Sequence, residues 1–123
     1  MSTIELTQDN FEKTIAGGIV LVDWWAAWCG PCRAFAPTFE AAAKKHADLV
    51  FGKVDTDAQP ELSGSFGIRS IPTLMVFRDG ILVFAQPGVL PAAVLDELIG
   101  KVRALDMDDV RRKIAEADAE AEA

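Results

Sequence analysis

Cys29 and Cys32 are the only two cysteines of the chain, and Gly30 and Pro31 separate them. A bridge this short closes almost no loop, so it cannot join distant parts of a fold. Because the chain has a single histidine, a closed four-ligand metal site lacks ligands, and we expect no metal. Two thiols at this spacing are typical of redox chemistry, whereas the alternative is a pair of small buried hydrophobic residues.

The residues around the pair predict that it lies between a buried strand and a helix. Residues 19–25 are apolar almost throughout, which is typical of a central strand buried on both faces. Pro31 suits the first turn of a helix that we expect to reach about His46. The unpaired N–H groups and the dipole at that helix start stabilise a thiolate at Cys29. Cys32 follows about one turn later on the same side, within reach of any sulfur bound to Cys29.

Patterning along the rest of the chain predicts an α/β fold with a mixed central sheet. We expect further strands at 3–6, 49–54, 73–77 and 81–85, and helices at 60–64 and 91–105. Residues 7–10 offer capping residues for a first helix that reaches about Ala16. The turn at residues 78–80 indicates an antiparallel hairpin. The core face of the last helix is expected to carry Val94, Leu95, Leu98, Ile99 and Val102. The order βαβαβ followed by ββα places helices on both faces of the sheet.

Composition restricts the classes of function. The 123 residues fit one folded domain, half of them are hydrophobic, and the formal charge is −7. An acidic chain is unsuited to bind nucleic acid or an anionic membrane surface. The longest apolar stretch, residues 19–22, stops at Asp23 and is too short to cross a membrane. With no basic, apolar leader at the N-terminus, we expect a cytoplasmic protein.

Residues 106–123 differ from residues 1–105. They carry seven acidic and three basic residues, which amounts to −4 of the total charge of −7. We therefore divide the chain into a folded domain, 1–105, and an acidic C-terminal extension, 106–123, either helical or disordered. Met107, Val110 and Ile114 are spaced to line one side of a helix. The extension is interpreted as a solubilising tail, with a segment that docks to a partner as the alternative.

The segment Trp28-Cys29-Gly30-Pro31-Cys32 is identical to the active-site pentapeptide of the thioredoxin family, and the resemblance covers about residues 3–105. Further matching segments follow in the family's order: residues 22–26, Pro37, 53–55, 67–74, 79–80 and Gly88. The resemblance implies a thioredoxin fold and a protein-disulfide reductase in which Cys29 is the nucleophile and Cys32 the resolving thiol.

The same resemblance implies partners for the reaction. These are oxidised protein substrates and a flavin-containing thioredoxin reductase that passes on electrons from NADPH. The chain has no Gly-x-Gly-x-x-Gly motif of its own, so we expect no bound cofactor. We also expect a monomer.

Asp23 is the candidate for proton transfer, and Lys53 is the candidate for its charge partner. A carboxylate inside an apolar strand has a raised pKa, which suits a proton acceptor near pH 7. The resemblance implies that Asp23 takes the proton of Cys32 and that Lys53 is the charge partner of Asp23. The alternatives are an acid at a strand end and a lysine in solvent.

Substrate contacts follow from the resemblance and from the exposed apolar residues near the pair. The Ile71–Pro72 bond is expected to be cis and to present the Ile71 backbone, with which a substrate peptide pairs as a strand. Trp24 is interpreted as a core residue. The candidate substrate-binding residues are Trp28, Gly30, Pro31, Ile71, Pro72 and Gly88.

The direction of the reaction depends on the residues between the cysteines. Gly30-Pro31 resembles the reducing members of the family, whereas oxidants and isomerases usually carry a histidine there. The Gly30-Pro31 pair therefore favours a reductase, with a disulfide isomerase or a binding, chaperone-like module as alternatives.

Ala27 departs from the family, since many thioredoxins have an acid or a lysine at this position.

Overall fold

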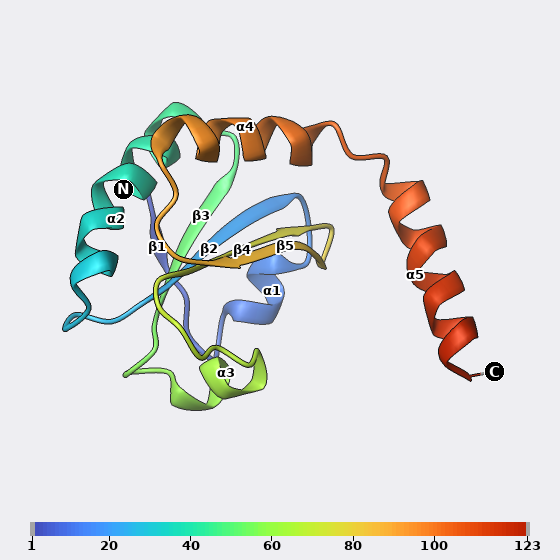
Figure 1. Ribbon diagram of the computed structural model, residues 1–123, viewed down its shortest axis with the longest axis horizontal. Coiled ribbons are helices and arrows are strands. Elements are labelled where there is room, and N and C mark those ends of the chain that lie inside the picture. Colours follow the sequence, from blue (N-terminus) through green and yellow to red (C-terminus); the bar gives the residue numbers. More distant parts are fainter. Residues whose placement is uncertain (1, 123) are drawn as a thin grey trace.

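The computed structural model describes residues 2–122, and this part of the chain contains one five-stranded sheet. The strands are β1 (Ile4–Glu5), β2 (Ile19–Trp25), β3 (Val50–Asp55), β4 (Thr73–Arg78) and β5 (Ile81–Pro87). The helices are α1 (Phe11–Ile15), α2 (Gly30–Lys45), α3 (Pro60–Ser65), α4 (Ala92–Arg103) and α5 (Met107–Glu122). The order in the sheet is β1-β3-β2-β4-β5 (Figure 1). The predicted α/β fold with a mixed sheet is confirmed.

Strand β2 is the centre of the sheet. It runs parallel to β3 on one side and antiparallel to β4 on the other, and its middle residues are buried. Because successive side chains of a strand point to opposite faces, Leu21 and Asp23 share one face, while Val20, Val22 and Trp24 share the other. The continuous apolar run therefore fills two cores at once, and Asp23 lies on the same face as Leu21.

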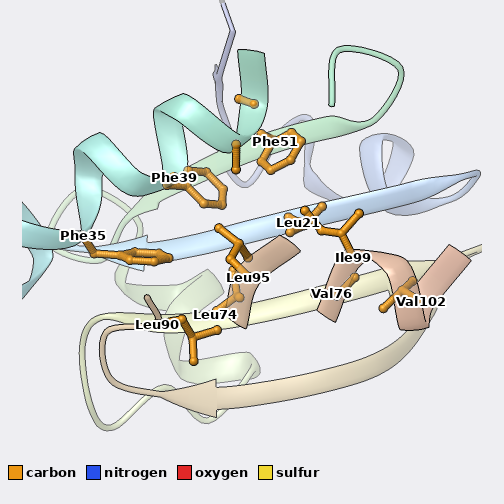
Figure 2. Close-up of a cluster of buried hydrophobic side chains, with 12 residues drawn as sticks. Leu21, Phe35, Phe39, Phe51, Leu74, Val76, Leu90, Leu95, Ile99 and Val102 are labelled. Carbon is orange, nitrogen blue, oxygen red and sulfur yellow. The ribbon is translucent and has the colours of Figure 1, made fainter. Parts of the chain in front are cut away.

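Each face of the sheet is covered by a pair of helices. On the Leu21 face, Phe35 and Phe39 of α2 pack with Leu95 and Ile99 of α4 (Figure 2). On the opposite face, α1 and α3 supply Phe11 and Leu62 to a cluster that includes the fully buried Trp24. Each large side chain buried on either face contributes roughly 1.5–3 kcal/mol to the stability of the fold. This burial holds the sheet between its two layers of helices.

The β4–β5 hairpin closes through Asp79 and Gly80, which both have positive φ, 53° and 82°. Two positive φ values in a two-residue loop match the twist of antiparallel strands, so the tight turn holds their register. Both strands are slightly longer than the sequence predicts, because pairing continues to Thr73 with Pro87 and to Arg78 with Ile81.

One predicted core position of α4 is wrong. Leu95, Ile99 and Val102 are buried, but Val94 is 44% exposed. The apolar face of α4 is narrower than the sequence pattern suggests, and Val94 lies on its flank beside an open hollow that Phe84 also lines. Sequence periodicity places a residue on a face but does not show where that face ends.

Helix α5 follows a short connection after α4 and stands apart from the rest of the fold (Figure 1). Its first residue, Met107, is buried, whereas every residue from Arg111 to Glu122 is exposed. Residues 107–122 are thus helical, and only the start of the helix packs against the body of the protein.

The end of α4 is held by one side chain. Arg78 Nη1 donates to the carbonyl oxygens of Val102 at 2.8 Å, Arg103 at 3.3 Å and Leu105 at 2.9 Å. These carbonyls lie at the helix end, where partners within the helix run out. Arg78 therefore ties the hairpin to the point from which α5 departs.

We expect Arg78→Met to lower the free energy of unfolding by about 1–3 kcal/mol, because the half-buried carbonyls lose a charged donor. Urea unfolding measures the loss. Lys44→Met serves as the matched control, since Lys44 is exposed on α2 and makes no side-chain hydrogen bond within residues 2–122. Equal stability of the two variants would contradict this role of Arg78.

Candidate active site

Cys29 and Cys32 are joined by a disulfide, and their Cα atoms are 5.2 Å apart. Cys29 is the N-cap of α2, so it has an extended backbone, and Gly30 and Pro31 follow in the first turn. Both cysteines are almost fully buried, at 4% and 3% exposure. The predicted position of the pair, between a buried strand and a helix start, is confirmed.

The start of α2 is arranged to stabilise negative charge on one of the two sulfurs. The backbone N–H of Cys32 donates to Cys29 Sγ at 3.2 Å. The positive end of the helix dipole points at the same atom, and the first turn contains no acidic residue to oppose it. A thiolate at Cys29 therefore gains both a hydrogen bond and a favourable field, which lower a thiol pKa.

Asp23 is a buried carboxylic acid in the central strand β2. Its residue exposure is 1%, and neither carboxyl oxygen has a hydrogen-bond partner among the described residues. Burial raises its pKa from 3.8 to about 7, while the charge of Lys53 acts in the opposite direction. Asp23 lies on the face of β2 that α2 covers, and Cys32 belongs to α2. The carboxyl group and Cys32 are therefore on the same side of the sheet.

Lys53 is the neighbour of Asp23 across the sheet but not its ion-pair partner. The two residues are paired in the β2–β3 register. The Lys53 ammonium lies over the Trp25 ring, 4.9 Å from its centroid, in a cation–π arrangement. No ion pair joins it to Asp23 within residues 2–122, so its charge acts on the carboxyl group through space.

A third segment completes the site. The Ile71–Pro72 peptide bond is cis, as the resemblance implies, and Ile71 O lies 3.7 Å from Cys29 Sγ. Gly88 N donates to Pro72 O at 2.8 Å and has a φ of +101°, which favours glycine. The loop before β4 and the end of β5 are thereby held beside the disulfide.

Trp28 is the most exposed large apolar side chain near the disulfide, at 69% exposure. It is nevertheless oriented, because its Nε1 donates to Asp57 Oδ2 at 3.0 Å. Asp57 is held in turn by the Asp55 carboxylate, which accepts from Asp57 N at 3.0 Å. The sequence analysis missed Asp57: it is 29 residues from Trp28, and no local pattern marks it.

The described residues contain no cluster of three or more histidine, cysteine or acidic side chains suited to hold a metal ion. Among the helices that the structure describes, none is both long and apolar enough to cross a membrane.

Comparison with known proteins places this site in a family. The sequence model described as "Thioredoxin" matches residues 2–101. "Putative thioredoxin 2" of Streptomyces coelicolor is 58% identical over 121 residues, covering 98% of this chain and 90% of that protein. The "Thioredoxin" of Listeria monocytogenes is 45% identical over 98 residues, covering 79% and 95%.

Solved structures agree with the fold. A mutant thioredoxin from Halobacterium salinarum superposes with a TM-score of 0.77 at 30% identity, covering 85% of this chain and 95% of that one. The thioredoxin of Malassezia sympodialis gives 0.71 at 33% identity, covering 80% and 89%.

A buried cysteine pair that forms a disulfide at the start of a helix, on this mixed sheet, defines a thiol–disulfide oxidoreductase. The chain belongs to the thioredoxin family, and it is a thiol–disulfide reductase that needs no bound cofactor.

The raised pKa of Asp23 makes stability depend on pH. The folded protein keeps a proton up to about pH 7 that the unfolded chain releases near pH 4. The contribution of Asp23 to the free energy of unfolding is therefore greatest below pH 4, falls as pH rises toward 7, and then levels off. The total loss is on the order of 4 kcal/mol.

We expect Asp23→Ala to remove this dependence in the oxidised protein. Relative to wild type, the variant gains several kcal/mol between pH 4 and pH 8, because the loss at Asp23 no longer occurs. Urea unfolding at a series of pH values measures both curves. Parallel curves would show that Asp23 titrates at its ordinary pKa and would contradict the assignment.

Proposed function

We propose that Cys29 is the attacking thiolate, Cys32 the resolving thiol and Asp23 the proton acceptor in the reduction of protein disulfides. The observation that carries this division of roles is the hydrogen bond from the Cys32 backbone to Cys29 Sγ at the N-cap of α2. Of the two sulfurs, the one at the N-cap receives the stabilisation of the helix terminus, so it ionises more readily.

In the first step, the Cys29 thiolate attacks one sulfur of a substrate disulfide. A mixed disulfide forms between Cys29 and the substrate, and the other substrate sulfur leaves as a thiolate that takes a proton from solvent. The nearby Ile71 carbonyl supports this step, since its backbone offers an extended substrate segment a partner for pairing as a strand.

In the second step, the Cys32 thiol gives its proton to the Asp23 carboxylate. The resulting thiolate attacks Cys29 Sγ, the Cys29–Cys32 disulfide forms, and the second substrate sulfur leaves reduced. Two electrons have then passed from the protein to the substrate. A pKa of about 7 suits Asp23 to this role, because the group is partly ionised at neutral pH and can take and return a proton.

The substrate is a protein that presents a disulfide to the surface around the pair. Trp28 supports this proposal, because a flat, exposed ring whose nitrogen is fixed by Asp57 is suited to contact apolar surface. The surface is proposed to consist of Trp28, Gly30, Pro31, Ile71, Pro72 and Gly88.

The dithiol is regenerated by a partner. We propose a flavin-containing thioredoxin reductase that uses NADPH, since the family supplies this partner and the sequence contains no dinucleotide-binding motif. We also propose a cytoplasmic location, because a general reductase needs a compartment in which thiols stay reduced.

We expect Cys32→Ser to accumulate mixed disulfides with an oxidised protein substrate, because the second step cannot take place. Non-reducing gel electrophoresis shows the complex, and a reducing agent should release it. Cys29→Ser is the matched control, since it keeps one thiol at the site and should form no such complex. A complex that forms with Cys29→Ser but not with Cys32→Ser would reverse the two roles.

A further inference from the structure

The larger apolar residues of helix α5, Met107, Val110 and Ile114, lie at intervals of three and four. Ala117 and Ala121 continue the same line, within a segment that has alanine at every second position from 115 to 121. The seven-residue repeat is typical of a helix that packs lengthwise against another helix. A tail that serves only to solubilise the protein has no need of this periodicity.

The apolar stripe of α5, residues 107, 110, 114, 117 and 121, is covered only at its start. Met107 is buried and Val110 is half-buried, but Ile114 is 42% exposed and the residues beyond it are exposed. Among residues 2–122, one ion pair joins the exposed part of α5 to the body, from Arg111 to Asp79 at 3.9 Å.

A gap lies between the stripe and the edge strand β5. It forms a hollow of about 360 Å³ with a mainly apolar lining. Figure 1 shows α5 separated from the β4–β5 hairpin along its length. On the strand side the hollow is lined by Ile81, Leu82 and Val83, and Leu82 is 44% exposed. A helix that covers the stripe therefore also faces the exposed residues of β5.

The charges that flank the stripe change sign halfway along it. In the first heptad the flanking positions are Arg111 and Lys113, and in the second they are Asp118 and Glu120. The two basic residues contact acids of their own helix. Asp118 and Glu120 form no ion pair within the part of the chain that the structure describes. One half of the helix is thus complementary in charge to the other half.

We propose that α5 binds the α5 of a second copy of this chain in antiparallel orientation. Two-fold symmetry about the middle of the helix places Ile114 against Ala117, and Val110 against Ala121, each contact occurring twice. Every layer then combines a branched side chain with an alanine, which allows a close approach. At the flanks, Arg111 faces Asp118 and Lys113 faces Glu120.

The antiparallel orientation follows from where the bodies are attached. Each body is joined to the N-terminal end of its α5, so parallel helices would bring two bodies to the same end. The antiparallel pair separates them. It also leaves the active sites open, since α5 and the start of α2 lie on opposite sides of the molecule (Figure 1).

The dimer should be weak and dependent on concentration. Two helices of 16 residues bury less surface than the roughly 1,200–2,000 Å² that is usual in stable complexes. The sequence analysis led us to expect a monomer, and helix α5 favours a reversible dimer in its place.

Sedimentation equilibrium of the full chain tests this proposal. The average mass should rise from 13.3 kDa toward about twice that value with increasing concentration. Ile114→Asp should weaken the association about tenfold or more, because it places charge in the centre of the pair, without changing reductase activity. A wild-type mass that stays at 13.3 kDa throughout, or full association of Ile114→Asp, would overturn the proposal.

Charge exchange gives a sharper test. Arg111→Glu with Lys113→Glu makes all four flanking positions acidic, whereas Asp118→Lys with Glu120→Lys makes them all basic. Each double variant alone should remain monomeric, and an equimolar mixture of the two should associate. Glu116→Lys with Glu122→Lys is the matched control, since it changes the charge equally on the outward side, and it should still associate. Failure of the mixture, or loss of association in the control, would contradict the proposed pairing.

Orientation is tested by cross-linking in a protein that carries Cys29→Ser and Cys32→Ser. Oxidation by air should join Val110→Cys to Ala121→Cys when the two variants are mixed. Ala121→Cys alone should stay largely unlinked, because residue 121 faces residue 110 in an antiparallel pair. Efficient linking of Ala121→Cys to itself would show a parallel pair and overturn the proposed arrangement.

Discussion

The chemistry of this protein depends on one helix terminus, the first turn of α2. There a backbone N–H group donates to the sulfur of Cys29 over 3.2 Å, and the helix dipole points at the same atom. The rest of the fold serves to hold this terminus in place. The central strand β2 leads directly into the start of α2, and the aromatic side chains of α2 pack the helix against the sheet. The loop with the cis bond closes the site from a third direction.

Asp23 is a destabilising group at the centre of the fold, and its support of this chemistry is our proposal. A carboxyl group in the middle of a buried strand lowers stability at neutral pH, since ionisation in an apolar environment is costly. The two hydrophobic cores on either side of β2 offset that cost. The charge of Lys53, on the neighbouring strand, reduces the cost of ionising Asp23 but does not remove that cost. The Lys53 ammonium lies over the Trp25 ring instead of pairing with the carboxylate. Asp23 is thereby left with a pKa near neutrality.

The parts of the site that depend on local sequence could be predicted. Cysteine spacing, Pro31 at a helix start and the hairpin turn at Asp79-Gly80 are each encoded within a few residues, and the structure contains all three features. Contacts across the sheet could not be predicted. The bond from Trp28 to Asp57 forms only because β2 and β3 end side by side, and the position of Lys53 over Trp25 depends on the same register. The helical state of residues 107–122 was one of two expected states, and its separation from the body is visible only in three dimensions.

The central claim is that the Cys29–Cys32 pair donates electrons to other proteins. Its reduction potential tests this claim most directly, measured by equilibrating the protein with graded dithiothreitol or glutathione buffers and following the emission of the neighbouring Trp25 and Trp28. The account predicts a potential of about −270 mV, the value already measured for thioredoxins. The reason is that Gly30-Pro31 provides no histidine that would favour the reduced form. A potential of roughly −180 mV, the value of protein disulfide isomerase, would contradict the account and indicate an isomerase.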